Sequence, residues 1–192
     1  MRTLLKAALI ATAVMSLPCL GDRSFADDAR DEHHLWKVID ARGQVVGALA
    51  NMFPDSGDGM SPGVLLNVHG VTVFVPIQRA NGADGQTVAS QYGWGATLYV
   101  NYSSADCSGT PFVIGNQSAA LRPSLVVRQG ADVTLYIAPD TYSTNVAPST
   151  RSTRFLSDPC IAGTPLNRIE GWIPESSFPL TQHYPEPLTL HD

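Results

Sequence analysis

Residues 64–75 read Val-Leu-Leu-Asn-Val-His-Gly-Val-Thr-Val-Phe-Val, two apolar runs separated by the dipeptide His69-Gly70. In the second run, valines alternate with Thr72 and Phe74, the period-two pattern of a strand with one buried face. Glycine tolerates the positive φ that a two-residue hairpin turn requires. The stretch therefore predicts a β-hairpin, and with it a fold built from antiparallel strands.

The same pattern recurs along the chain, with turn residues between the runs. The further strand candidates are residues 35–40, 45–50, 98–103, 111–114, 125–127, 132–137, 150–156 and 166–173. Many short strands separated by turn signals are typical of an antiparallel β-sandwich or barrel. We therefore expect one all-β domain over residues 35–173, with no long helix and no internal repeat.

Composition excludes several other classes of protein. The chain has 192 residues, of which 44% are hydrophobic and 15% charged. A disordered chain would be poorer in apolar residues, and a coiled coil would repeat leucine and charged residues at heptad spacing. A chain of this size buries enough surface for a core without metals or many cross-links.

The N-terminus has the pattern of a secretory signal peptide. Two basic residues among the first six precede an apolar run at residues 7–17, about 11 residues long and too short to span a membrane. Small residues ending at Ala26 predict cleavage there, leaving residues 27–34 as a flexible lead-in. Cys19 keeps open the alternative of a lipoprotein anchored through that cysteine.

Export and charge together limit the partners. Loss of residues 1–26 removes three of the 12 basic and one of the 17 acidic residues, so the net charge of the remaining chain is −7. A chain this acidic has no general attraction to phosphate backbones or anionic lipid. We expect a periplasmic or secreted protein with no membrane span and no nucleic-acid partner, its oligomeric state left open.

Two cysteines remain after cleavage, Cys107 and Cys160, and only one pairing is possible. In an oxidising compartment we expect them to form a disulfide. The alternative is two buried thiols. A cysteine metal site is disfavoured because the chain has no CxxC spacing.

Residues 174–192 contain four prolines. Proline removes a backbone donor and interrupts regular structure. The sequence therefore predicts an extended Pro-rich tail, laid over the sheet or partly mobile.

Residues 59–63 match G-x-S-x-G, the nucleophile elbow of α/β-hydrolases. The residue after Ser61 donates its N–H to the oxyanion in that elbow, but here it is Pro62, which has none. The elbow also requires a following helix, whereas a β-branched run follows. We therefore interpret residues 54–63 as a loop and assign no catalytic residue.

Two Gly-rich acidic stretches, residues 55–59 and 81–85, carry oxygen ligands but lack the twelve-residue calcium pattern. Plain turns are the favoured interpretation. The histidines show no ligand spacing and are interpreted as solvated; they are His33, His34, His69, His183 and His191. We predict no metal site and no cofactor.

The candidate binding residues are Tyr92 and Trp94, in a Tyr-Gly-Trp-Gly segment that an exposed loop could use to stack on a sugar or an aromatic partner. In the favoured alternative, Trp94 plugs one end of the core and Tyr99 decorates the outer face. Trp36 and Trp172 lie in apolar runs and are expected in the core.

Residues 38–47 read Val-Ile-Asp-Ala-Arg-Gly-Gln-Val-Val-Gly, and residues 102–111 read Tyr-Ser-Ser-Ala-Asp-Cys-Ser-Gly-Thr-Pro. Together they resemble a β-rich domain of uncharacterised exported bacterial proteins, with a VxDAxGxxVG hairpin, a later YxSxDCxGxP strand and a second cysteine downstream. The resemblance covers residues 35–173 and implies a bacterial envelope or secreted setting. It implies no established activity and no functional residues.

The sequence thus predicts a non-enzymatic exported module that binds a protein or glycan or has a structural role. One alternative is a hydrolase whose groups meet only in the folded chain, for example Asp132 and Glu170. Another is a subunit of a surface appendage or phage-derived fibre.

Overall fold

The computed structural model describes residues 35–52, 60–82, 84–114, 121–147, 150–153, 160–162 and 169–192, all within one compact unit. The predicted signal peptide, the lead-in and Cys19 lie outside the described residues. Within the described ranges, no helix is long and apolar enough to cross a membrane.

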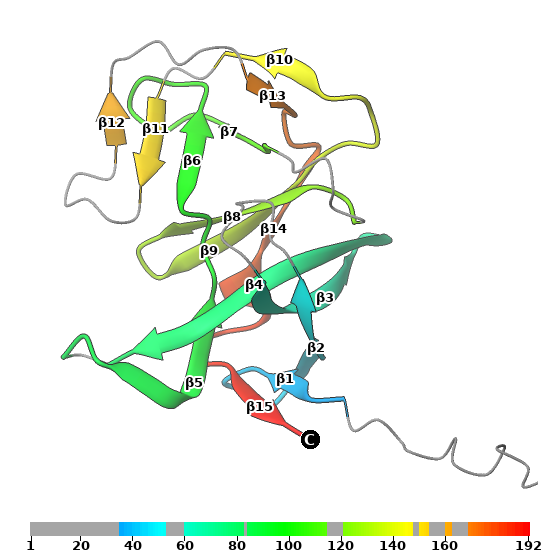
Figure 1. Ribbon diagram of the computed structural model, residues 1–192, viewed down its shortest axis with the longest axis vertical. Helices are drawn as coiled ribbons and strands as arrows, with labels where there is room; N and C mark the ends of the chain where they lie inside the picture. The colour runs from blue at the N-terminus through cyan, green and yellow to red at the C-terminus, as the bar shows by residue number, and fades with distance from the viewer. Residues whose placement is uncertain are drawn as a thin grey trace, which may run out of the picture. The chain divides into compact units, whose positions relative to one another are not determined.

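Six antiparallel strands form the largest sheet, in the order β15-β1-β2-β3-β4-β5 (Figure 1). They are β1 (Lys37–Ile39), β2 (Val45–Met52), β3 (Ser61–Val68), β4 (Val71–Asn81), β5 (Thr87–Trp94) and β15 (Thr189–His191). Tyr92 of β5 and Leu188, just before β15, exchange two backbone hydrogen bonds of 2.8 and 2.7 Å. The two ends of the sheet therefore meet, and the six strands form a nearly closed barrel.

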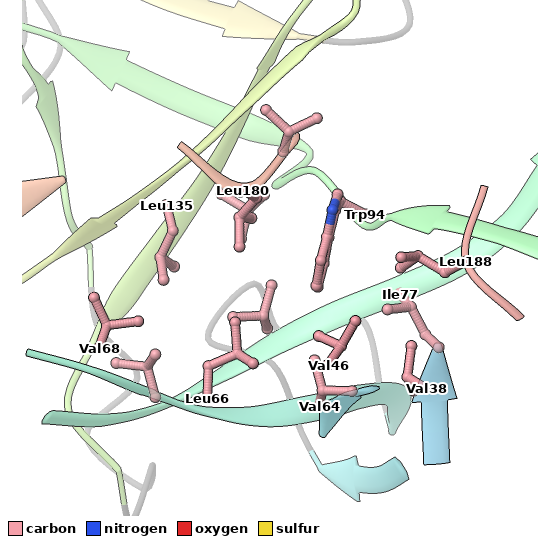
Figure 2. Close-up of a cluster of buried hydrophobic side chains, with 14 of the residues drawn as sticks. Val38, Val46, Val64, Leu66, Val68, Ile77, Trp94, Leu135, Leu180 and Leu188 are labelled. Carbon is pink, nitrogen blue, oxygen red and sulfur yellow. The ribbon is translucent and has the colours of Figure 1, made fainter. Parts of the chain in front are cut away.

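The hairpin of β3 and β4 forms as predicted. His69 and Gly70 both have positive φ, 52° and 86°, as a two-residue hairpin turn requires. The side chains of Val73 and Val75 point into the barrel and are fully buried. Figure 2 shows this barrel core. Side chains of β1 to β5 and Leu188, just before β15, contribute to it, together with side chains from outside the large sheet. The barrel core consists of Val38, Val46, Val64, Leu66, Val68, Val73, Val75, Ile77, Trp94, Val126, Val133, Leu135, Ile137, Leu180 and Leu188.

A three-stranded sheet separates the barrel core from a second cluster. Its strands are β14 (Ser176–Pro179), β9 (Asp132–Ile137) and β8 (Ser124–Gln129), in that order. In β8, Val126 faces the barrel core whereas Leu125 and Val127 face the second cluster. Because β8 is buried on both faces, its sequence is a continuous apolar run rather than an alternating one.

The second cluster lies against the remaining strands. Four of them form the sheet β12-β11-β6-β7 and two form a ribbon: β6 (Tyr99–Tyr102), β7 (Pro111–Phe112), β11 (Thr150–Thr153), β12 (Cys160–Ala162), β10 (Thr144–Val146) and β13 (Ile169–Gly171). Val113 and Trp172 exchange backbone hydrogen bonds of 3.0 and 2.8 Å and join the two groups. The second cluster consists of Val100, Tyr102, Val113, Leu125, Val127 and Ala138.

The prediction of an extended tail over residues 174–192 is wrong. This segment forms β14, the short helix α1 (Leu180–His183) and β15, and buries Leu180 and Leu188 completely. Its prolines fall where regular structure begins or ends, as Pro179 does between β14 and α1. Burial of Leu180 and Leu188 supplies the free energy that an extended tail would lack.

The predicted strands over residues 35–50, 64–75 and 125–137 are confirmed by β1 to β4, β8 and β9. Residues 61–63, predicted as part of a loop, instead begin β3. The strands β5, β10, β12, β14 and β15 and the helix α1 were not predicted. Each is short, or lies in a polar or proline-rich stretch with no clear alternation.

Candidate functional site

The predicted binding residue Trp94 is at the end of β5, not in an exposed loop. Its side chain is 0% exposed and faces the barrel core opposite Ile77. A buried ring has no free face for a ligand, so the prediction of a stacking site at Trp94 is wrong. The alternative, in which Trp94 plugs the core, agrees with the structure.

Tyr92 is half-buried against the barrel core. The guanidinium carbon of Arg79 lies 5.2 Å from the centroid of the Tyr92 ring, a cation–π contact. One ring face is therefore covered by Arg79, and Tyr92 does not form a stacking platform with Trp94.

An ion pair hydrogen-bonds to the backbone of Trp94. Arg128 donates to both carboxylate oxygens of Glu186, with nitrogen–oxygen distances of 3.1 and 2.5 Å. Arg128 also donates to the Trp94 carbonyl at 3.0 Å, while the Trp94 N–H donates to Glu186 Oε1 at 2.5 Å. We call Arg128, Glu186 and the Trp94 backbone the C-terminal clasp.

Gly93 makes the close approach of Glu186 possible. A Cβ at position 93 would lie 2.9 Å from Glu186 Oε1. Gly93, in the segment that suggested an exposed loop, thus has a packing role, because it leaves room for a carboxylate beside the backbone.

The turn between β1 and β2 holds the same C-terminal segment. The Asp40 carboxylate, fully buried, accepts from the N–H groups of Arg42 and Gln44 at 2.9 and 2.8 Å and pairs with the Arg42 guanidinium. Arg42 in turn donates to the carbonyl of His183. Asp40 therefore shapes a turn and directs Arg42 toward the C-terminal segment, a structural role.

Two of the predicted solvated histidines meet at one aromatic ring. The ring centroid of Phe178 lies 4.2 Å from that of His183, which stacks on it, and 6.5 Å from that of His69, which meets it edge to face. Both histidines are exposed. Among the described residues, no group of three or more His, Cys, Asp or Glu side chains could hold a metal ion.

The remaining predicted residues are not brought together. Ser61 lies in β3 and pairs with Met52, so it has no elbow geometry. Asp84 accepts from the N–H of Gln86 at 3.0 Å, which is turn chemistry. Residues 55–59 lie outside the described residues. Asp132 begins β9 and Glu170 is central in β13, in different sheets.

The turn after β6 is self-contained. Asp106 accepts from the Ser108 hydroxyl and N–H at 2.6 and 3.1 Å. The hydrogen bond from the Ser108 hydroxyl has the largest effect, followed by those from the Ser108 N–H and the Ser104 hydroxyl. Together they lower the pKa of Asp106 from 3.8 to about 2. Hydrogen bonds from Ser108 thus stabilise the charged form of Asp106.

Cys107, at φ 58°, follows in this turn and packs against the second cluster. The four-stranded sheet contains both β6, which precedes this turn, and β12, which begins at Cys160. The side chain of Cys160 lies outside the described residues, so the predicted bridge stays a prediction.

Trp36, just before β1, is an exposed aromatic residue with partly buried leucines as neighbours. The carbonyl of Trp36 accepts from the Leu49 N–H at 2.7 Å, so Trp36 continues the ladder between β1 and β2. Side chains two residues apart on an extended strand share a face, so Trp36 prolongs the core-facing side of Val38. Leu190, paired with Val38, and Leu49 are partly buried against the core.

We call Trp36, Leu49 and Leu190 the Trp36 surface. Trp36 is 51% exposed, and the neighbouring Leu35 is 62% exposed. The prediction that Trp36 lies in the core is therefore wrong. Trp36 has the right phase for burial but is half-exposed, which strand alternation alone does not reveal. Trp172, by contrast, packs partly against the second cluster, and Tyr99 is 51% exposed, as expected for the outer face.

No protein-family model, no curated protein and no solved structure matches this chain. Its function is therefore argued from the geometry of the described residues.

Proposed function

We propose that the protein is an exported, non-enzymatic binding module that holds its ligand at the Trp36 surface. The observation that carries this proposal is the half-exposed Trp36, which its backbone bond to Leu49 and strand alternation put on the same face of the sheet as Val38. An exposed tryptophan that continues an apolar core loses water-exposed apolar area whenever a ligand covers it.

The shape of an indole limits the ligand chemistry. A flat ring beside two aliphatic side chains, Leu49 and Leu190, fits a ligand with a flat or aliphatic C–H face. The C–H face of a sugar ring and the side chain of an apolar peptide both have this chemistry. The test therefore includes one arm for each source.

Export and the disulfide belong to the same proposal. The N-terminal pattern supports a periplasmic or secreted setting. In that setting a bond between Cys107 and Cys160 would tie the turn after β6 to β12 and stabilise the second cluster without touching the Trp36 surface.

The test uses binding to two panels: neutral oligosaccharides and short acetylated peptides rich in leucine or phenylalanine. We expect one panel to contain a saturable ligand, and Trp36→Ala to bind it about tenfold more weakly, the loss expected for a buried aromatic contact. The matched control is Tyr99→Ala, because Tyr99 is also 51% exposed but lies on β6.

Two results would contradict the proposal. One is equal loss of binding in the Trp36 and Tyr99 variants, which would show that the ligand binds non-specifically to exposed aromatic side chains. The other is turnover of a panel member by the wild-type protein, which would favour the hydrolase alternative.

A further inference from the structure

The outer side of β15 is an open strand edge. β15 is an end strand of the order β15-β1-β2-β3-β4-β5, and among the described strands it pairs with β1 alone. Just before it, Leu188 exchanges backbone hydrogen bonds with Tyr92 of β5, and this bridge is isolated. From the bridge, β15 runs away from the hairpin of β4 and β5 (Figure 1). In the described part of the chain, no ladder covers the outer side of β15 beyond Leu188.

Leu190 directs its backbone N–H and C=O toward that open edge. In a strand, the backbone groups of successive residues point to opposite sides, so those of residues two apart point to the same side. The N–H and C=O of Leu188 point to β5. Those of Leu190 therefore point away from β1. A donor and an acceptor on the open side of an edge strand form a template to which another strand can add.

The side chain of the same residue belongs to the Trp36 surface. Leu190 is the cross-strand partner of Val38, so the two side chains lie on one face of the sheet, the face that Trp36 prolongs. A strand added at β15 meets the Leu190 backbone with its own backbone and the Leu190 side chain with one of its side chains. An extended peptide supplies both contacts at strand spacing, whereas the C–H face of a sugar ring supplies only the second.

The opposite face of these strands carries a positive charge. Lys37 and His191 are cross-strand partners there, and both are exposed. Among the described residues, no acidic side chain forms an ion pair with Lys37. Side chains of a strand alternate between its faces, so a peptide on β15 directs one side chain toward Leu190 and the next toward His191 and Lys37. Complementarity therefore favours apolar residues that alternate with acidic ones.

We propose that the ligand is an extended peptide that adds a strand to the outer edge of β15, with apolar side chains toward Leu190 and acidic side chains toward Lys37 and His191. This inference rests on the ligand site proposed above and narrows its ligand to one chemical class. In an antiparallel pair, the residue opposite Leu190 exchanges both backbone bonds with it and shares its face. The apolar residues of the peptide are therefore the ones whose N–H groups bond to β15.

The first experiment tests these backbone bonds with acetyl-Leu-Glu-Leu-Glu-Leu-amide, titrated into the isotopically labelled full-length protein and followed by NMR. One form of the peptide is N-methylated at the central leucine, and its matched control is N-methylated at the glutamate that follows. We expect the first form to bind at least about tenfold more weakly than the parent peptide, and the control to lose less than about threefold. Equal losses, or a larger loss in the control, overturn the proposal.

The second experiment tests the charge contact. Replacing both glutamates of the peptide with glutamine is expected to weaken binding to the wild-type protein about twofold to fivefold, the range for an exposed ion pair. In Lys37→Gln, most of this preference is expected to disappear. The glutamine peptide is the internal control, because its affinity is expected to be the same for both proteins. A preference of unchanged size in Lys37→Gln contradicts the contact with Lys37.

Failure of this inference is distinguishable from failure of the proposed ligand site. If the pentapeptide does not bind, and a neutral oligosaccharide binds the wild type but not Trp36→Ala, strand addition is overturned and the ligand site stands. If the pentapeptide binds the wild type and Trp36→Ala equally, with the expected effect of leucine methylation, strand addition stands and the ligand site at Trp36 is overturned. If neither probe binds, both are overturned.

Discussion

Arg128 and Glu186, separated by 58 positions in the chain, both hydrogen-bond to the backbone of Trp94. Arg128 holds the Trp94 carbonyl, Glu186 holds its N–H, and the two side chains pair with each other. The contact joins β8, β5 and the C-terminal segment at a single point. It lies beside the isolated bridge between Tyr92 and Leu188 that joins the two ends of the sheet.

Glu186→Ala is expected to destabilise the protein by about 1–3 kcal/mol, because it leaves the Arg128 charge and the Trp94 N–H without their partner in a partly buried site. The measurement is urea unfolding followed by circular dichroism. The control is Asp140→Ala, which removes a 92% exposed ion-pair partner of Arg122 and is expected to cost less than about 1 kcal/mol. Equal losses in the two variants would contradict a structural role for the clasp.

Leu188→Ala is expected to cost about 2–5 kcal/mol, because it leaves a cavity in the barrel core at the point of closure. Leu65→Ala makes the same chemical change on an exposed side chain of β3 and is expected to cost under about 1 kcal/mol. Unfolding midpoints in urea check both values. A Leu188 variant as stable as the Leu65 variant would mean that the C-terminal segment does not close the core in solution.

Cys107→Ser is expected to lower stability by up to about 4 kcal/mol in oxidising buffer, the chain-entropy value for closing a loop of roughly 50 residues. In excess reductant, wild type and variant are expected to melt at nearly the same temperature, because neither then has a bridge. Thermal melting followed by circular dichroism measures both. A difference of the same size in both buffers would contradict the bridge to Cys160.

Asp106 is expected to titrate with a pKa of about 2, because the Ser108 hydroxyl and N–H stabilise its charged form. A folded-state pKa below the unfolded value of about 3.9 gives a contribution to stability that is present above pH 4 and is lost as the pH falls toward 2. The carboxyl carbon shift in NMR follows the titration. Ser108→Ala is expected to raise the midpoint toward the unfolded value; an unchanged midpoint would contradict the assigned cause.

Local pattern was sufficient to predict the hairpins. From Thr72 to Ile77 in β4 and throughout β9, buried side chains alternate with more exposed ones, because each strand has one face on the barrel core. In β8, which was predicted as a strand from its apolar run and the turn after it, alternation is absent because the strand separates two clusters. Alternation did not predict β5, whose first residues are largely exposed.

The candidate site was not predictable from local pattern. Trp36 and Trp94 are both tryptophans in phase with buried neighbours, yet one is half-exposed and the other fully buried. Trp94 is covered by the distant C-terminal segment, whose Tyr184 carbonyl accepts from the Trp94 indole at 3.0 Å. Local pattern does not reveal such a contact between segments far apart in the chain.

The amino-acid sequence by itself determined the strand-rich class, the tight turns and the inward faces of the longest strands, because these depend on residues within a few positions of one another. The tertiary structure alone decided that Leu188 meets Tyr92, that Glu186 reaches Arg128 and that Trp36 stays at the surface. Those outcomes depend on contacts between segments far apart in the chain, where a buried leucine and a paired charge outweigh the extended conformation that the prolines favour locally.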